Sequence, residues 1–190
     1  RQQNLEQVPR LKQELDRLDA MLDELLTFSK LDAGQYQLHK QPFDLPELLT
    51  EIIEVNQVEA DARQQTINLH TSSGIQIYAD SRLLARAVEN VLRNAIKYSP
   101  AASMINISLL QQANQLVLTI RDQGPGIAPE QLDAVFEPFY RVSNSRNSNT
   151  GGTGLGLAIV AQIVRQHGGQ VRAENSPQGG LCITMHLPVK

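Results

Sequence analysis

The sequence predicts an α+β protein in which a few helices cover a mixed, mainly antiparallel sheet, forming a two-layer sandwich behind a long N-terminal helix. Three observations support this fold class. Leucines recur every three or four residues over the first thirty positions, as in a coiled-coil-like helix. Short stretches of alternating apolar and polar residues, typical of strands, follow in the rest of the sequence. Segments with helical periodicity and capping residues lie between those stretches.

The N-terminal helix is amphipathic. Its apolar stripe consists of Val8, Leu11, Leu15, Leu18, Leu22 and Leu25. Leu26 and Phe28 widen the apolar arc, and Pro9 either starts the regular part or bends it. Gly34 suits a left-handed cap at the end of the helix. The stripe requires a partner helix, and the rest of the sequence contains no second helix of this kind.

The later elements follow from caps, breakers and alternation. Asp44 and Glu47 stand at capping-box spacing and begin a helix that runs to about Arg63. Asp80 caps another helix, which ends before Pro100. A last helix is expected over residues 155–166, closed by His167-Gly168-Gly169, with a short helix after Pro129. Strands are expected at 67–69, 75–77, 104–110, 116–120, 171–173 and 181–187. The predicted division is therefore a helix at 1–33, a linker at 34–43 and a sandwich at 44–190.

Composition excludes several classes of protein. The 190 residues are 41% hydrophobic, and 17 basic against 20 acidic residues give a net charge of −3, so no basic excess favours nucleic acid. The one cysteine, Cys182, excludes an internal disulfide framework and a cysteine-based zinc site. No apolar run approaches the ~20 residues of a membrane span, and no signal peptide opens the sequence. Because the sequence begins with Arg1 rather than Met, we expect an excised fragment, which leaves a membrane-bound parent open.

The segment 80–98 places two kinds of side chain on opposite faces of its helix. At ~100° per residue the apolar face consists of Leu84, Val88, Val91, Leu92 and Ala95. The opposite face carries Asn90, Asn94 and Lys97. Asparagine is a poor helix former, so two of them one turn apart favour a function over a merely solvated face, the alternative interpretation. Their oxygens, with a lysine, suit phosphate and Mg²⁺.

Two glycine segments lie further along the sequence. Asp122-Gln123-Gly124-Pro125-Gly126 follows a strand, where glycine lets the backbone approach a flat ring and the carboxylate can accept a hydrogen bond from an exocyclic amine. Adenine has that amine, and guanine has a carbonyl there; a plain tight turn is the alternative. Gly151-Gly152-Thr153-Gly154-Leu155-Gly156-Leu157 runs into a helix, whose start favours phosphates. It matches neither a P-loop nor a dinucleotide fingerprint, and a hinge without ligand is the alternative.

The segment between the two glycine stretches is aromatic and ends in a cation. Phe136 and Phe139 are expected to pack in the core and anchor a mobile polar loop over residues 141–152. Arg141 is placed to reach a terminal phosphate when that loop closes.

Taken in order, these segments resemble the conserved boxes of bacterial sensor histidine kinases. The N box corresponds to residues 89–100, the first glycine box to 122–126, the F box to 136–141, the second glycine box to 152–157, and a weaker third to Gly179-Gly180 with Thr184. This resemblance covers residues 44–190. The helix that ends at Asp32 resembles the second helix of the family's dimerisation domain.

The resemblance implies a Bergerat-type ATP-binding fold, shared with gyrase-type and chaperone ATPases, that transfers the γ-phosphoryl of Mg-ATP to a histidine. Asn94 and Asn90 would hold magnesium on the phosphates, and Asp122 would bind the adenine amine. Glu89 and Arg141 are the candidate catalytic residues, with Arg141 at the γ-phosphate and Glu89 at an acidic position of the N box. The remaining candidate nucleotide-binding residues are Lys97, Tyr98, Gly124, Gly126, Ile127, Phe139, Gly152, Thr153, Gly154, Leu155 and Gly156.

The family's acceptor histidine lies on the first dimerisation helix, beside an acidic residue and shortly before a proline. None of His39, His70, His167 and His186 fits, and His167 ends a helix where a cation suits the dipole. We therefore expect ATP binding without autophosphorylation by this chain alone. The implied partners are an acceptor helix of the same protein or its dimer mate and the receiver domain of a response regulator. The implied parent is a homodimer anchored in the bacterial inner membrane, with this part cytoplasmic and touching neither nucleic acid nor membrane.

Two rival classes remain. The first is a different enzyme on the same fold, either a serine kinase of the anti-sigma type or a mechanical ATPase; the N-terminal helix and the short loop disfavour both. The second is a non-enzymatic dimerisation or docking platform, which the complete set of Asn90, Asn94, Asp122 and glycines disfavours. An unchanged magnesium-dependent nucleotide affinity in Asn94→Ala would favour the platform.

Overall fold

The computed structural model of the 190-residue chain describes residues 2–142 and 152–189, and for residues 2–10 and 13 it describes the backbone alone. Residues 143–151, which hold most of the expected polar loop and Gly151, lie outside the described residues. The side chains of Val8 and Pro9 lie outside them as well.

Five strands form one mixed sheet in the order β2-β4-β5-β7-β6. The strands are β2 (Thr66–Thr71), β4 (Met104–Gln112), β5 (Gln115–Arg121), β6 (Gln170–Asn175) and β7 (Leu181–Pro188). The β2–β4 pair is parallel and the other three pairs are antiparallel, which confirms the mixed, mainly antiparallel sheet. The expected hairpin joins β4 to β5, with Ala113 at a φ of 50° in the turn.

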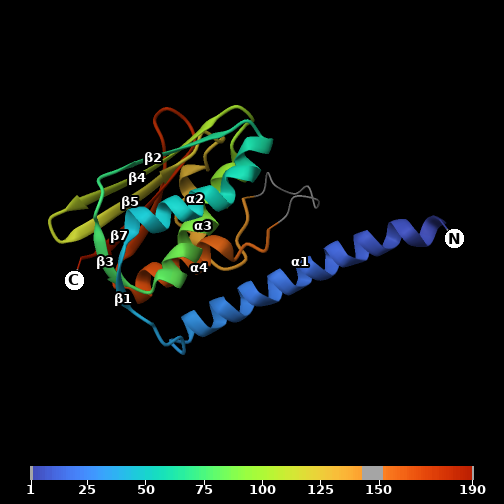
Figure 1. The fold of residues 1–190 in the computed structure, drawn as a ribbon, viewed down its shortest axis with the longest axis horizontal. Helices are drawn as coiled ribbons and strands as arrows, with labels where there is room; N and C mark the ends of the chain where they lie inside the picture. Colours follow the sequence, from blue (N-terminus) through green and yellow to red (C-terminus); the bar gives the residue numbers. More distant parts are fainter. Residues whose placement is uncertain (1, 143–151, 190) are drawn as a thin grey trace.

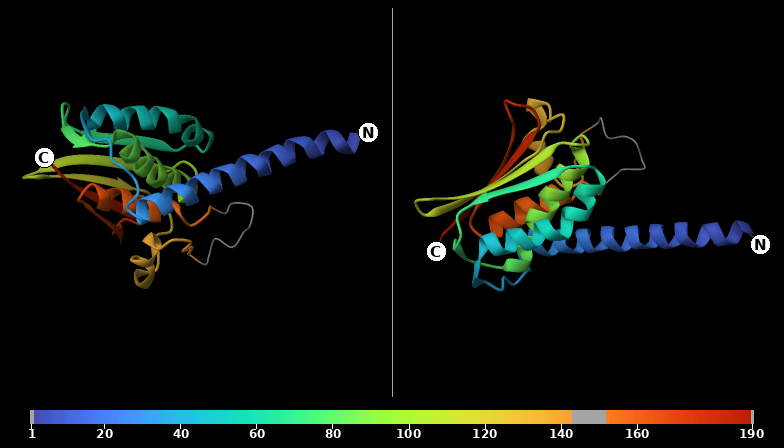
Figure 2. Two further views of the ribbon diagram at one scale, coloured as in Figure 1. Left: turned by 90° about the horizontal axis from the view of Figure 1, so that it is seen from below. Right: turned by 45° about the horizontal axis from the view of Figure 1, so that its top comes forward.

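Three helices cover one face of this sheet (Figures 1 and 2): α2 (Leu45–Ala62), α3 (Ser81–Tyr98) and α4 (Gly156–Gln166). The predicted caps are confirmed, because the Asp44 side chain accepts a hydrogen bond from the Glu47 N–H at 3.0 Å and Asp80 accepts one from the Leu83 N–H at 3.2 Å. Two short 3-10 turns, η1 (Pro129–Gln131) and η2 (Ala134–Phe136), precede α4. The α+β two-layer sandwich predicted from the sequence is thus confirmed.

The core lies between the helices and the sheet. The apolar face predicted for α3 is buried as expected, with Val88 at 1% and Leu92 at 0% exposure. It packs with the inward side chains of the central strands, among them Ile105 on β4 and Leu118 on β5. Burying this face leaves the opposite face of α3, with Asn90 and its neighbours, directed away from the sheet.

A second, two-stranded sheet was not expected. The strand β1 (Gln41–Asp44) pairs antiparallel with β3 (Gln76–Ala79), so the last residues of the predicted linker at 34–43 form a strand. This strand could not be predicted from the sequence pattern, because it is only four residues long and contains Pro42. Proline normally marks an edge strand or a joint. The partner lies more than thirty residues further along the chain.

The N-terminal helix α1 (Gln2–Asp32) projects from the sandwich (Figures 1 and 2). It begins before Pro9, so Pro9 does not start it. Gly34, at a φ of 63°, caps its end as predicted, and the Gln35 N–H donates to the Lys30 carbonyl at 2.9 Å. Leu31 is fully buried, whereas the described leucines of the stripe are exposed, with Leu22 at 56%. Among the described residues, no helix has the length and apolar character that crossing a membrane requires.

Candidate nucleotide-binding site

Asp122 directly follows β5 and is 8% exposed. Its Oδ1 accepts hydrogen bonds from the backbone N–H groups of Gly124 at 2.7 Å and Leu181 at 2.9 Å. Burial raises the pKa of the Asp122 carboxyl, and these two hydrogen bonds oppose the rise. Within the described part of the chain both donors meet Oδ1, so Oδ2 is the oxygen left for a ligand.

Glycines fix the backbone around Asp122. A Cβ on Gly180 would lie 2.0 Å from the Asp122 carbonyl oxygen, and Gly180 has a φ of 90°, so only glycine fits there. A Cβ on Gly124 would lie 3.0 Å from the carbonyl oxygen of Tyr98. The first glycine segment therefore packs between the end of α3 and the turn before β7, close to the candidate residue Tyr98.

Asn175, at the end of β6, holds the first glycine segment from the other side. Its Oδ1 accepts from the Ile127 N–H at 2.9 Å, and its Nδ2 donates to the Ile127 carbonyl at 2.6 Å. Asn175 also lies against Gly126, since a Cβ on Gly126 would meet its Oδ1 at 2.7 Å. Sequence reasoning missed Asn175, because pairing between a side chain and a backbone nearly fifty residues away has no local signature.

The second glycine segment lies along the asparagine face of α3. The Asn90 Nδ2 donates to the Gly156 carbonyl at 3.1 Å. A Cβ on Gly152 would lie 3.9 Å from the Lys97 Nζ, which in turn lies 5.1 Å from the centroid of the Tyr98 ring. The structure thus brings together the start of α4 and the polar face of α3, as the joint interpretation of the two motifs requires. Asn94 is half-buried one turn beyond Asn90 on the same face.

Phe139 departs from its predicted place. Phe136 packs against the core as expected, but the Phe139 side chain is 61% exposed, so the expectation of core packing was wrong. The reason is its backbone: Phe139 has a φ of 64°, and its N–H donates to the Gly154 carbonyl at 3.0 Å. A Cβ on Gly154 would lie 2.8 Å from the Phe139 carbonyl carbon. This tight backbone contact turns the ring away from the core.

Thr153 connects the second glycine segment to α1. Its hydroxyl donates a hydrogen bond to Oε2 of Glu24 and accepts one from the Leu155 N–H at 3.1 Å. Leu155 itself is 2% exposed and packs in the core, which anchors the segment. Glu24 was not identified from the sequence, because 129 residues separate it from Thr153.

The two candidate catalytic residues lie at the margins of this arrangement. Glu89 is half-buried on α3, directly before Asn90. Arg141 is exposed and stands at the edge of the described residues, just before the part of the chain that is not described. Their roles stay predictions.

The donor set suits magnesium held through phosphates. Among the described residues, no group of three or more His, Cys, Asp or Glu side chains is placed to hold a metal ion. On the polar face of α3 the amide oxygens of Asn90 and Asn94 are candidate ligands, and Asn90 lies against the second glycine segment. Because Asn90 gives its amide nitrogen to Gly156, its carbonyl oxygen is left for a cation or its water. Mg²⁺ prefers oxygen ligands and keeps several waters, so these residues fit it.

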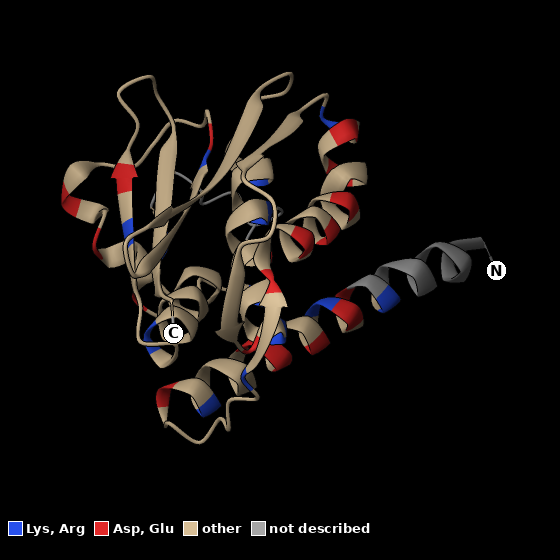
Figure 3. Cartoon of the chain, turned by 60° about the vertical axis from the view of Figure 1, so that its left-hand side comes forward, with Lys and Arg blue, Asp and Glu red and all other residues tan. Residues whose placement is uncertain are grey.

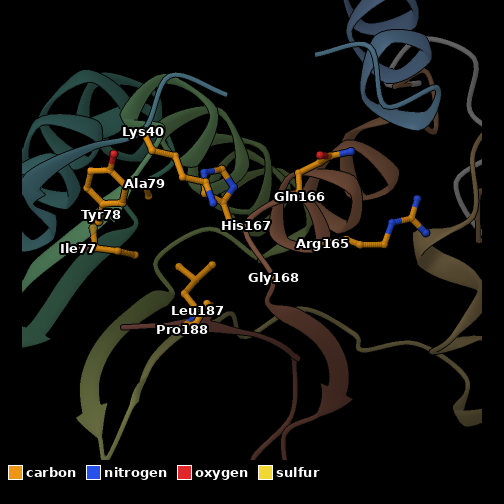
Figure 4. Close-up of a pocket in the computed structure, with 10 residues that line it drawn as sticks. All are labelled: Lys40, Ile77, Tyr78, Ala79, Arg165, Gln166, His167, Gly168, Leu187 and Pro188. Atoms are coloured by element: carbon orange, nitrogen blue, oxygen red, sulfur yellow. The ribbon is translucent and has the colours of Figure 1, made fainter. Parts of the chain in front are cut away.

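A cavity of about 340 Å³ lies at the opposite end of α4 (Figure 4), where Lys40, Tyr78, His167 and Pro188 are among its lining residues. The His167 Nδ1 donates to the Ile163 carbonyl at 2.8 Å, and its Nε2 accepts from the Asp80 N–H at 3.1 Å.

Burial lowers the pKa of His167, and nearby Lys40 adds to this, while the hydrogen bond to Ile163 and the charge of Asp80 oppose it. A cation would suit the dipole at this helix end, but a neutral ring satisfies both backbone groups. His167 is structural, as predicted.

Fold and site together define a nucleotide-binding module: an α+β sandwich whose buried aspartate and two glycine segments border the polar face of one helix. The family described as histidine kinase-, DNA gyrase B-, and HSP90-like ATPase matches residues 79–190, and the chain belongs to this family.

Its relatives are sensor kinases. The chain is 39% identical over 181 residues to the sensor protein RstB of Escherichia coli (strain K12), covering 94% of this chain and 41% of RstB. A solved structure of the mycobacterial sensor histidine kinase MprB matches with a TM-score of 0.68 and 35% identity, covering 80% of this chain and 98% of that one. Full-length ShkA, solved in complex with AMPPNP, matches with a TM-score of 0.86 and 27% identity, covering 97% and 38%.

These comparisons confirm the resemblance: the chain contains an ATP-binding catalytic domain of the sensor histidine kinase type. The chain spans about two fifths of the length of the curated relatives it matches.

Proposed function

We propose that this chain binds Mg-ATP between the polar face of α3 and the two glycine segments, as the catalytic part of a sensor histidine kinase. The γ-phosphoryl is transferred to a histidine outside this chain and relayed to an aspartate of a response regulator. In this proposal residues 1–33 are the second helix of a dimerisation domain, 34–43 a linker and 44–190 the catalytic domain. The parent is a homodimer anchored in the bacterial inner membrane, with this part on the cytoplasmic side.

Asp122 is the observation that carries the proposal. A carboxylate that is nine-tenths buried, fixed through one oxygen by two backbone N–H groups, is preorganised to accept a hydrogen bond through the other. Adenine has an exocyclic amine at the position where guanine has a carbonyl, so adenine supplies such a donor there. The ring would lie near Tyr98 and the first glycine segment, whose backbone packs against the carbonyl of Tyr98 at Gly124.

The phosphates would extend toward the start of α4. The N-terminal N–H groups of that helix and the ammonium of Lys97 attract them, and Gly152, Gly154 and Gly156 let the backbone come close. Magnesium on the phosphates supplies charge neutralisation, with Asn90 and Asn94 orienting it. Arg141 is assigned to the γ-phosphate, and Glu89 stands near the site. The AMPPNP complex of the similar protein ShkA supports an adenine nucleotide as ligand.

The histidines support an acceptor outside this chain. His70 lies on β2 and His186 on β7, both in the sheet. His39 lies in the segment before β1, and both ring nitrogens of His167 are used by the backbone. The long helix α1 contains no histidine. We therefore expect no stable phosphohistidine when this chain is incubated alone with Mg-ATP.

Calorimetric titration with ATP and with GTP, each with and without magnesium, tests the proposal. We expect saturable binding of ATP, strengthened by magnesium, and no binding of GTP. Asn94→Ala should lose the magnesium-dependent part, while Arg93→Ala, an exposed neighbour on the same helix, should bind as the parent does. A folded chain that binds neither nucleotide would contradict the proposal and favour a docking platform. If ATP binds, addition of a separate peptide with the acceptor helix would test transfer of the γ-phosphoryl group to its histidine.

A further inference from the structure

The end of α1 is docked on the catalytic domain by polar contacts as well as by buried Leu31. Asp23 forms an ion pair with Arg86 of α3 at 2.8 Å. Near the helix end, Asp32 accepts from the Gln162 Nε2 of α4 at 2.7 Å. Figure 3 shows charged residues of both signs along the described part of α1. This docking holds the last turns of α1 beside both helices of the proposed site.

Glu24 makes the contact that matters for a nucleotide. Its Oε2 accepts from the Thr153 hydroxyl, and the same hydroxyl accepts from the Leu155 N–H directly before α4. A carboxylate is thus joined through a single hydroxyl to the amide at the start of α4. The positive end of a helix dipole favours an anion at this place, and here the anion is a side chain of α1. Glu24 therefore takes the electrostatic role that the proposed function gives to phosphate.

Two anions that compete for one helix end repel each other, and burial away from water strengthens the repulsion. The half-buried Glu24 must therefore raise the free energy of a bound polyphosphate, more for a triphosphate than for a diphosphate. An uncharged nucleoside would not be affected. By linkage, any ligand weakened by the Glu24–Thr153 contact must weaken that contact to the same degree.

We propose that Glu24 is a specificity-determining residue of the nucleotide site, which weakens binding in proportion to the charge of the polyphosphate and couples occupancy of the site to the docking of α1. The inference rests on the proposed function. It assigns to α1 a direct electrostatic effect on the site, in addition to its proposed role in dimerisation.

The test is calorimetric titration of the chain with ATP, ADP and adenosine in magnesium buffer at low salt. Glu24→Gln keeps the shape and the acceptor oxygen but removes the charge. We expect this variant to bind ATP about fivefold more tightly than the parent chain, ADP by a smaller factor and adenosine equally. The matched control is Asp19→Asn, which removes one acidic charge from an exposed position of the same helix. It should leave all three affinities unchanged.

Three results would overturn the inference and leave the proposed function standing. Equal ATP affinity in the parent chain and Glu24→Gln would show that the carboxylate does not oppose the phosphates. An equal gain for adenosine would show that Glu24 acts through packing rather than charge. An equal gain in Asp19→Asn would assign the effect to net charge. Failure of the parent chain to bind any of the three ligands would contradict the proposed function itself, and this inference with it.

Discussion

Polar side chains lie near both ends of α4, and they differ in how completely their hydrogen bonds are satisfied within the protein. At the C-terminal end, His167 is bonded at both ring nitrogens by backbone groups, from Ile163 and Asp80. At the N-terminal end, the groups are held on one side only: Asn90 through its amide nitrogen, Asp122 through Oδ1. Each keeps a second polar atom for a ligand.

A cavity and a titratable group therefore do not by themselves make a binding site. The cavity of about 340 Å³ is beside His167, where the hydrogen bonds of the ring are complete. The proposed site has half-satisfied polar groups fixed in place, which is the arrangement that binds a ligand without reorganisation. Changes at the two ends of α4 should therefore affect different properties, ligand binding at one and stability at the other.

The largest effect is expected for Gly180→Ala, which breaks the backbone arrangement around Asp122. The added Cβ would lie 2.0 Å from the Asp122 carbonyl oxygen, so the turn must move and the protein should lose about 3 kcal/mol of stability. Gly179→Ala is the matched control, because Gly179 has a nearly equal φ of 91° but nothing within 4 Å of the added Cβ. Its cost should be about 1 kcal/mol. Urea unfolding measures both, and equal losses would contradict the packing described.

The next largest effect is expected for Asp122→Asn, which tests the proposed adenine contact by weakening it. The variant loses a charge-assisted hydrogen bond to the ligand, worth about 2 kcal/mol, so the Kd for ATP should rise roughly thirtyfold. The control is Asp133→Asn, which changes an exposed aspartate further along the chain and should leave ATP binding unchanged. Calorimetry checks both, and unchanged binding in Asp122→Asn would place the base elsewhere.

A smaller effect is expected for Asn90→Ala, which removes a hydrogen bond between α3 and the start of α4. Loss of the hydrogen bond to the Gly156 carbonyl and of one oxygen near the metal should cost about 1 kcal/mol of ATP affinity, mostly in the presence of magnesium. Asn114→Ala, in the distant β4–β5 turn, should have no effect on binding. An equal loss with and without magnesium would argue against a role for Asn90 at the cation.

The smallest effect concerns the C-terminal end of α4 and pH. Because the pKa of His167 is lowered in the folded chain, the unfolded chain binds more protons near pH 6. His167 therefore contributes stability above the usual histidine pKa of about 6.5, and this contribution is lost as pH falls below it. The raised pKa of Asp122 has the opposite effect, because it lowers stability as pH rises, and it does so at lower pH. This effect is the same in every variant compared.

Urea unfolding across pH 5 to 7.5 should show a shallower pH dependence in His167→Gln than in the parent chain. His70→Gln, an exposed histidine on β2, is the control and should follow the parent. ATP binding by His167→Gln at pH 7.5 should be unchanged. A pH dependence equal to that of the parent chain would mean that folding does not lower the pKa of His167.

Much of the fold could be predicted because each element carries its own signal. The α3 helix has one apolar face and a capping aspartate, and both signals agree with the structure. The short strand β1 has no such signal, since Pro42 breaks the pattern and the pairing partner is remote. Local patterns therefore predict elements that are stable through their own periodicity and miss those that depend on a distant partner.

The candidate site shows the same limit. Asp122, Asn90 and the glycines were found because they occupy short motifs. Asn175 and Glu24 were missed, since their contacts, to Ile127 and Thr153, join segments that only the fold brings together. The outward ring of Phe139 was predicted wrongly because its positive φ depends on the contact with Gly154.

We expect nucleotide to bind at the N-terminal end of α4 and not beside His167. Backbone amide NMR of the chain, titrated with AMPPNP and magnesium, tests it most directly. We predict shift changes at Gly124, Gly152 and Gly156, with the amides of His167 and Gly168 unchanged. Saturable changes confined to His167 and Gly168 would contradict the proposed site and place the ligand in the cavity at the other end of the helix.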